Sequence, residues 1–183
     1  MHLMGDALGD FDDAIVNCVA WLPNGERMEC VAEQIPEILA QPSGFLWLEL
    51  RQPSPLVLEH VQALFGVHEL AIEDVHLAEQ RPKLEAYEPV QGETERESFF
   101  MVLTPVVTRS ATQDFALGEL HVFLDTRVVL LLHLGRYARD FDALGRFERA
   151  PLRLWRGMFN AVHAVLDEVV DDYVPWHGAF EER

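Results

Sequence analysis

The stretch from Leu70 to Tyr87 constrains the fold most, because Pro82 interrupts its helical pattern. Ile72 and Val75 have the spacing of a buried helix face. The residue before a proline is pushed out of helical geometry, so we expect the helix to end at Arg81. Lys83 to Tyr87 should then be extended. The local prediction is a helix, a sharp stop and a strand.

The same stretch is unusually rich in charge. Its carboxylates are those of Glu73, Asp74, Glu79 and Glu85, and a histidine and an Arg-Pro-Lys triplet lie among them. From composition and spacing alone, a solvated helix face joined to an edge strand accounts for this charge, since exposed Glu and Asp usually face water. A site for a cation is the functional alternative.

The rest of the chain alternates between strand and helix patterns. Strands are predicted at 14–22, 27–32, 45–50, 98–108, 117–124 and 127–133. Helices are predicted at 35–41, from Ser54-Pro55 to a stop at Gly66, and from Pro151 onward. We expect residues 1–13 to be flexible and residues 14–183 to form one domain.

Composition excludes several classes of partner. The 183 residues carry 31 acidic and 14 basic side chains, for a net charge of -17. This charge repels phosphate backbones and anionic lipid surfaces, so we expect no nucleic acid and no peripheral membrane binding. It permits a divalent cation as a partner without proving one.

The two cysteines and the apolar runs indicate a soluble chain as given. Cys18 and Cys30 lack the spacing of a zinc knuckle or a redox motif, and we interpret them as reduced thiols of a cytosolic protein. No secretory signal opens the chain. The longest apolar runs, such as Val128 to Leu132, are far shorter than the roughly twenty residues of a membrane-spanning helix.

Three motifs resemble a known family. They are Phe65-Gly66-Val67-His68 with Ala71-Ile72-Glu73-Asp74-Val75, then Gln80-Arg81-Pro82-Lys83-Leu84-Glu85-Ala86-Tyr87, and finally Val165-Leu166-Asp167-Glu168-Val169-Val170-Asp171-Asp172-Tyr173. In order and spacing they resemble the soluble domain of the CorA family of divalent-cation transporters. The first forty or so residues match nothing specific.

The resemblance implies an α/β fold, an α/β/α sandwich with a mixed central sheet that ends in the start of a stalk helix at Trp176 to Arg183. In the family this domain lies on the cytoplasmic side of the inner membrane, and the full-length protein is a pentamer with two membrane helices. The family's Gly-Met-Asn transport motif is absent here. We therefore expect an excised domain or a truncated relative that self-associates through its full-length parent.

The resemblance also implies a regulatory metal site between neighbouring domains. The matching positions are Glu73, Asp74 and Asp167, and the family's stalk aspartate would fall beyond Arg183. Cytosolic Mg2+ would bridge these carboxylates and hold the pore closed, with Co2+ or Zn2+ as less favoured ligands. A structural role is expected for Gln80, Arg81, Pro82, Lys83 and Tyr87. For Arg81, Pro82 and Lys83 this role is a helix stop together with pairing to nearby carboxylates such as Glu79 and Glu85.

Other functions stay open at this stage. Histidines that could suit the family's zinc-transporting branch are His68, His76 and His163. A freestanding cation-sensing module is a further alternative. The chain has no nucleophile elbow, phosphate loop or zincin motif, so we expect no enzyme. A metallophosphatase built from Glu73, Asp74, Asp167 and Asp171 would lack partner histidines at known spacing.

Overall fold

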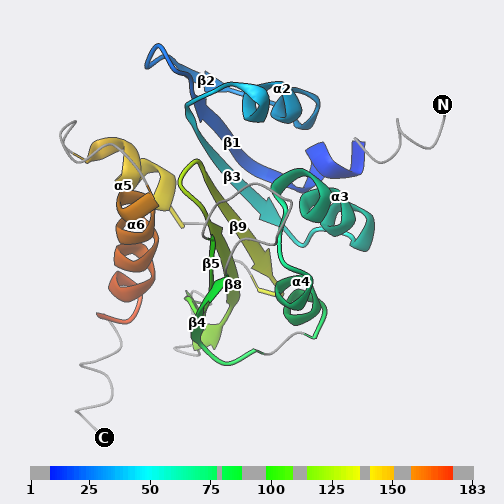
Figure 1. Cartoon of the computed structure of the whole chain (residues 1–183). Helices are drawn as coiled ribbons and strands as arrows, with labels where there is room; N and C mark the ends of the chain where they lie inside the picture. Colours follow the sequence, from blue (N-terminus) through cyan, green and yellow to red (C-terminus); the bar gives the residue numbers. More distant parts are fainter. Residues whose placement is uncertain are drawn as a thin grey trace, which may run out of the picture.

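A seven-stranded mixed sheet forms the centre of the molecule, in the strand order β2-β1-β3-β9-β8-β5-β4 (Figure 1). The computed structural model describes residues 9–77, 80–87, 98–108, 115–136, 141–150 and 158–174. Strands β3 and β9 are parallel, and every other neighbouring pair in this sheet is antiparallel. A separate two-stranded sheet pairs β6 with β7.

The strands of both sheets have the following bounds: β1 Ile15–Trp21, β2 Arg27–Glu29, β3 Phe45–Arg51, β4 Lys83–Tyr87, β5 Ser98–Leu103, β6 Val106–Thr108, β7 Phe115–Leu117, β8 Glu119–Leu124 and β9 Val128–Leu134. The helices are η1 Ala32–Gln34, α2 Ile35–Ala40, α3 Pro55–Phe65, α4 Glu69–His76, α5 Ala143–Arg149 and α6 Met158–Asp171. Among these helices, none combines the length and apolar character needed to cross a bilayer.

Alternating side chains of the central strands build two separate cores, one on each face of the sheet. On one face, Leu48 and Leu130 pack with Val57 of α3 and with Ala71 and Val75 of α4. The opposite core contains Trp47 and Leu131 together with Phe147, Val165 and Val169 of α5 and α6. Figure 1 shows α5 and α6 on one side of the sheet and α3 and α4 on the other. The predicted α/β/α sandwich is therefore confirmed.

Local signals position α3 where the sequence predicts it. The Ser54 hydroxyl accepts a hydrogen bond from the Val57 amide, and proline occupies the first helical position. Gly66 ends the helix in the left-handed region, with φ of 62°. The predicted hairpin of β8 and β9 is also confirmed, and the Asp125 carboxylate accepts the amides of Arg127 and Val128 in its turn.

Two predicted boundaries in the central region are wrong. Helix α4 ends at His76 and not at Arg81. A proline disfavours helical geometry in the residue before it, but it does not require the helix to extend as far as that residue. The strand predicted at 117–124 is broken at Gly118, where a Cβ would lie 2.6 Å from the Arg136 carbonyl oxygen. The chain changes sheets there, so β7 leaves the main sheet and pairs with β6.

The β run predicted at 98–108 is likewise split. Thr104 and Pro105 separate β5 from β6, as expected for a residue that cannot donate to a ladder. The second hairpin strand is also shorter than predicted, since β2 ends at Glu29.

Near the amino terminus, residues 9–14 are helical and Phe11 is buried, which differs from the flexible segment expected at 1–13. Helix α5 was not predicted. Residues 1–8, the start of the last predicted helix at 151–157 and the expected stalk start at 176–183 lie outside the described residues.

Candidate functional site

The carboxylate of Asp74 on α4 meets the side chain of Lys83 at the start of β4. Lys83 Nζ lies 2.6 Å from Asp74 Oδ2 and 3.1 Å from Glu85 Oε1. The hydroxyl of Tyr87 donates to Glu85 Oε2 at 2.7 Å. Because strand residues two apart share a face, Lys83, Glu85 and Tyr87 all point toward α4. These four residues are called the Lys83 cluster.

The Lys83 cluster sets one ammonium group against two carboxylates. Burial alone would lower the pKa of Lys83, but hydrogen bonds to Asp74 and Glu85 outweigh burial and raise this pKa. Glu85 has a lowered pKa, first because the Tyr87 hydroxyl donates to it and second because Lys83 does. The pKa of Tyr87 is raised by burial and by its bond to Glu85. The cluster therefore favours an ionised Glu85 and a neutral Tyr87.

Histidines surround this cluster in structural roles. The His68 ring stacks on Tyr87 with centroids 4.6 Å apart, and its Nδ1 accepts the Leu70 amide at the start of α4. On β8, His121 is fully buried and its Nε2 lies 2.5 Å from Glu119 Oε1. Burial lowers the pKa of His121, although Glu119 opposes this shift. His68 therefore caps a helix and supports an aromatic ring.

The other motif residues of this region lie nearer to solvent. Glu73 is exposed one position before Asp74, on the outer side of α4. Gln80 is half-buried, while Arg81 and Pro82 are exposed in the connection to β4. The expected pairing of Lys83 with Glu85 is confirmed. The partner expected at Glu79 lies outside the described residues.

Asp167, the third predicted metal ligand, lies on α6 and is held by an arginine of α5. Arg146 Nη1 donates to Asp167 Oδ2 at 2.7 Å, and Nη2 donates to Asp171 Oδ2 at 2.7 Å. The Nε of Arg146 contacts Glu168, whose carboxylate also accepts the Asp142 amide at 2.9 Å. These carboxylates raise the pKa of Arg146, with Glu168 first. Arg146, Asp167, Glu168 and Asp171 form the Arg146 cluster.

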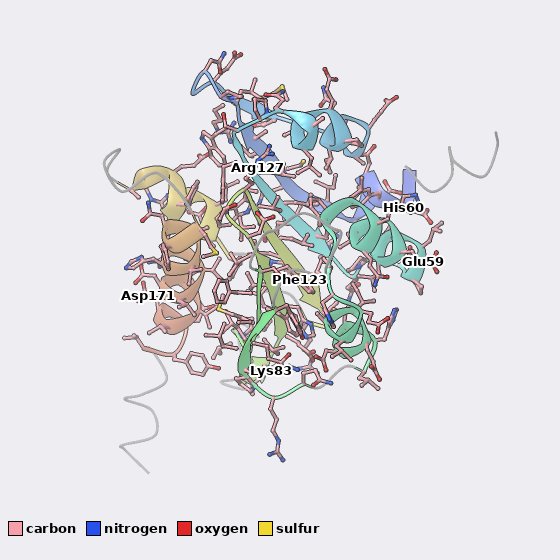
Figure 2. All side chains as sticks on the ribbon, in the orientation of Figure 1. Glu59, His60, Lys83, Phe123, Arg127 and Asp171 are labelled. Atoms are coloured by element: carbon pink, nitrogen blue, oxygen red, sulfur yellow. The ribbon has the colours of Figure 1, made fainter. Side chains whose placement is uncertain are left out.

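The two clusters lie on opposite faces of the sheet. Helix α4 packs on the face that carries Leu48, and α6 packs on the face that carries Trp47. Figure 2 shows Lys83 on β4 and Asp171 on α6, well separated in the view. Within the described part of the chain, no three His, Cys, Asp or Glu side chains gather as a metal site. One chain therefore does not bring Asp74 and Asp167 together.

Sequence reasoning missed a buried polar group at the carboxyl ends of the parallel strands. Glu49 of β3 and His133 of β9 are almost fully buried, and their side chains lie 2.6 Å apart. Asn17 donates to the second oxygen of Glu49 at 2.7 Å. A charged residue inside an apolar strand was the available signal for Glu49. Nothing local pointed to Arg146, whose partners lie more than twenty positions away.

A family model and a curated relative both match this chain. A family model described as "CorA-like Mg2+ transporter protein" matches residues 42–183. The protein named "Putative metal ion transporter YfjQ" of Bacillus subtilis (strain 168) is 24% identical over 148 residues, which are 80% of this chain and 43% of that protein.

Solved structures share the fold at low identity. The full-length CmaX protein matches with a TM-score of 0.66 at 18% identity, covering 92% of this chain and 49% of that one. The soluble domain of CorA from Methanocaldococcus jannaschii gives 0.57 at 13% identity, over 92% and 62%. The cytoplasmic domain of ZntB from Vibrio parahaemolyticus RIMD 2210633 gives 0.56 at 10%, over 92% and 63%. The chain thus spans between 43% and 63% of the length of these proteins.

Proposed function

Because the chain belongs to the CorA-like Mg2+ transporter family, we propose that it is the cytoplasmic regulatory domain of a divalent-cation transporter. Its parent carries the ion across the inner membrane, and this domain senses cytosolic Mg2+ and gates the pore without catalysing a reaction. The family match over residues 42–183 and the fold shared with the soluble domain of CorA support this role.

The position of the predicted ligands carries the proposal. Glu73 and Asp74 lie on α4, and Asp167 lies on the opposite face of the sheet, on α6. A cation that uses ligands from both faces must therefore sit between two copies of the domain. Such a site responds to how copies are arranged, which is what a sensor of this kind requires.

Carboxylates between two copies of the domain suit Mg2+ better than a softer metal. Mg2+ is a hard cation that binds oxygen, keeps several waters and needs few direct protein ligands. With a net charge of -17, two copies repel each other unless cations lie between them. Bound Mg2+ stabilises the closely packed, closed arrangement, and its loss lets the copies separate.

Two basic side chains of the domain lower the affinity of the proposed site for Mg2+. Asp74 is already paired with Lys83, and Asp167 is paired with Arg146. A metal ion has to compete with these contacts, which weakens its binding. We therefore expect the isolated domain to respond to Mg2+ only in the millimolar range and to form monomers or small oligomers.

A zinc-transporting relative is the second candidate. The ZntB and CorA domains match this fold almost equally well, with TM-scores of 0.56 and 0.57. Of the candidate histidines, His68 is already engaged with Tyr87 and the Leu70 amide, which argues against its use as a zinc ligand. Repeating the titration below with Zn2+ in place of Mg2+ separates the two.

The test is a Mg2+ titration of the 183-residue chain followed by sedimentation velocity, with ionic strength held constant by sodium chloride. We expect reversible association at millimolar Mg2+ that weakens at least threefold in Asp74→Asn and in Asp167→Asn. Glu59→Gln is the matched control, since Glu59 is an exposed acid of α3 that lies apart from Lys83 and Asp171 (Figure 2). It should associate like the unmodified chain.

Two outcomes would contradict the proposal. An equal loss of Mg2+-dependent association in Glu59→Gln would show that Mg2+ acts only by general charge screening. A tight pentamer at low protein concentration without Mg2+ would favour a freestanding assembly module. Sequencing the gene beyond the codon for Arg183 is an independent test. A reading frame that continues to an apolar span ending in Gly-Met-Asn would support a transporter parent.

A further inference from the structure

Two cysteines that are twelve positions apart in the sequence lie in direct contact in the fold. Cys18 belongs to β1 and Cys30 follows β2, and the Cys30 amide donates to the Cys18 carbonyl oxygen at 2.9 Å. Their Sγ atoms are 2.8 Å apart, and both thiols are reduced. The spacing of the two cysteines matches no known motif, because antiparallel strand pairing brings them together.

The backbone geometry of the pair suits a disulfide bond. Val19 is opposite Glu29 in the register of β1 and β2, which puts Cys18 opposite Cys30. Directly opposite residues in a hydrogen-bonded antiparallel pair have Cα atoms about 5.5 Å apart. Disulfides need a Cα separation of about 4.4–6.8 Å. A bond between the two sulfur atoms therefore requires no movement of the strands.

The two thiols are chemically unequal. A hydrogen bond joins the two thiols, and it lowers the pKa of Cys30 against the opposing effect of burial. The same contact, burial and the nearby carboxylate of Asp12 all raise the pKa of Cys18. The thiolate is the attacking species in disulfide exchange. The lowered pKa favours Cys30 as the attacking residue and Cys18 as the resolving one, and the place of Cys30 directly after the edge strand β2 favours the same assignment.

The position of the pair gives reagents a route to Cys30. Strand β2 is the outermost strand of the sheet and contains only three residues, two of which, Arg27 and Glu29, are exposed. Val31, directly after Cys30, is 48% exposed. Short edge strands open locally at low cost in free energy. Opening of β2 uncovers Cys30 while the central strands stay paired.

We propose that Cys18 and Cys30 form a thiol–disulfide modification site that low-molecular-weight disulfides oxidise. The Cys30 thiolate attacks one sulfur of oxidised glutathione, forms a mixed disulfide and releases one glutathione thiolate. The Cys18 thiol then loses its proton and attacks Cys30 Sγ, which expels the second glutathione. Two protein thiols are oxidised by two electrons, and one glutathione disulfide is reduced to two glutathiones.

The bond would lock the amino-terminal hairpin. It closes a loop around the turn at Pro23-Asn24-Gly25 and fixes the edge strand β2 to β1. Cross-linking restricts the unfolded chain, which stabilises the folded one. The oxidised chain should therefore melt several degrees above the reduced chain.

The test oxidises the 183-residue chain with excess glutathione disulfide and measures intact mass. The expected mass falls by two hydrogen atoms, and a reductant reverses the change. Trypsin cuts after Arg27, between the two cysteines, so a non-reducing digest should yield peptides 1–27 and 28–51 joined as one species. The melting temperature should rise with oxidation and fall again on reduction.

Single variants test the order of attack. Cys18→Ser keeps a hydrogen-bond donor beside Cys30 and should form a stable glutathione adduct. Cys30→Ser should form its adduct about tenfold more slowly. A matching thermal transition in each variant shows that it is folded. Two glutathione adducts on the unmodified chain, cross-linked dimers or unreacted thiols would each overturn the proposal, and faster labelling of Cys30→Ser would overturn the assigned roles.

Discussion

The Lys83 and Arg146 clusters both gather carboxylates around one basic side chain, but they differ in how far those carboxylates are exposed to solvent. In the Lys83 cluster, the nearest partner is Asp74, with a side chain only 18% exposed. In the Arg146 cluster, Glu168 is 9% exposed, whereas Asp167 is 48% exposed. The Arg146 cluster thus combines one buried contact with two that face solvent.

The difference follows from the chemistry of the two basic side chains. A guanidinium holds several donors in a rigid plane and can serve three carboxylates at once, whereas an ammonium is a compact point charge. Arg146 can give up an exposed partner and keep the buried one. If Asp74 is drawn away, Lys83 keeps only its contact with the more exposed Glu85. An external cation can therefore bind Asp167 at a smaller cost in folding stability than Asp74.

Arg146→Ala should have the largest effect on stability. It leaves the nearly buried Glu168 without its charged partner, and breaking such a pair costs about 3 kcal/mol of unfolding free energy. Urea unfolding followed by circular dichroism measures this loss. Arg149→Ala is the matched control, because Arg149 and Asp142 are both exposed and their pair contributes about 1 kcal/mol or less. Equal losses in the two variants would remove the distinction between buried and exposed contacts.

Lys83→Met should cost less, about 1–2 kcal/mol. The methionine removes the ammonium, whose Nζ lies 5.5 Å from the centroid of the Phe100 ring, and leaves Asp74 without its cation. Lys83 is the only lysine of the chain, so no other lysine can replace it. The same urea titration applies, and restoring stability with Asp74→Asn in the double variant would show that the unpaired carboxylate causes the loss. A neutral single variant would contradict the assigned role.

Tyr87→Phe should change the acid side of the stability profile. The Tyr87 hydroxyl is the first cause of the lowered pKa of Glu85. At pH values just below the ordinary glutamate pKa of about 4.3, the unfolded chain binds more protons than the folded one, so stability falls as pH falls. Without the hydroxyl, Glu85 contributes less to this fall. Urea midpoints between neutral pH and the acid transition should therefore fall less steeply in Tyr87→Phe.

Asp167→Asn should have the smallest effect, within about 0.5 kcal/mol, because its contact with Arg146 is exposed and two other carboxylates remain. Thermal unfolding without divalent cations measures it. The proposed Mg2+ response should nevertheless weaken in this variant, which would separate a role in cation binding from a role in folding. A loss as large as that of Arg146→Ala would make Asp167 a structural residue instead.

The sequence predicted features whose causes lie within a few neighbouring residues. The limits of α3 follow from Ser54 and Gly66, and the β8–β9 turn follows from Asp125. The buried strand β3 was equally clear from its continuous apolar run. In each case, the hydrogen bond or the backbone conformation responsible can be read directly from adjacent positions.

Features that depend on distant partners were not predictable in this way. Helix α5 is short, and its role becomes clear only where Arg146 meets Glu168, 22 positions later. The contact of Cys18 with Cys30 depends on strand register. Family resemblance identified the predicted metal ligands, but it did not predict that they lie on two faces of the sheet. Metal binding by Glu73, Asp74 and Asp167 stays a prediction.

The parallel pairing of β3 with β9 also determines when this domain can fold. Glu49 and His133, which meet across these strands, are 84 positions apart in the chain. Contacts between such distant positions form slowly, because a long loop must close before they stabilise anything. During synthesis, the amino-terminal strands must wait until β9 has left the ribosome before the sheet can close. Until then, the edge of β3 is an exposed surface for mispairing, and a chaperone would be needed longest at this stage.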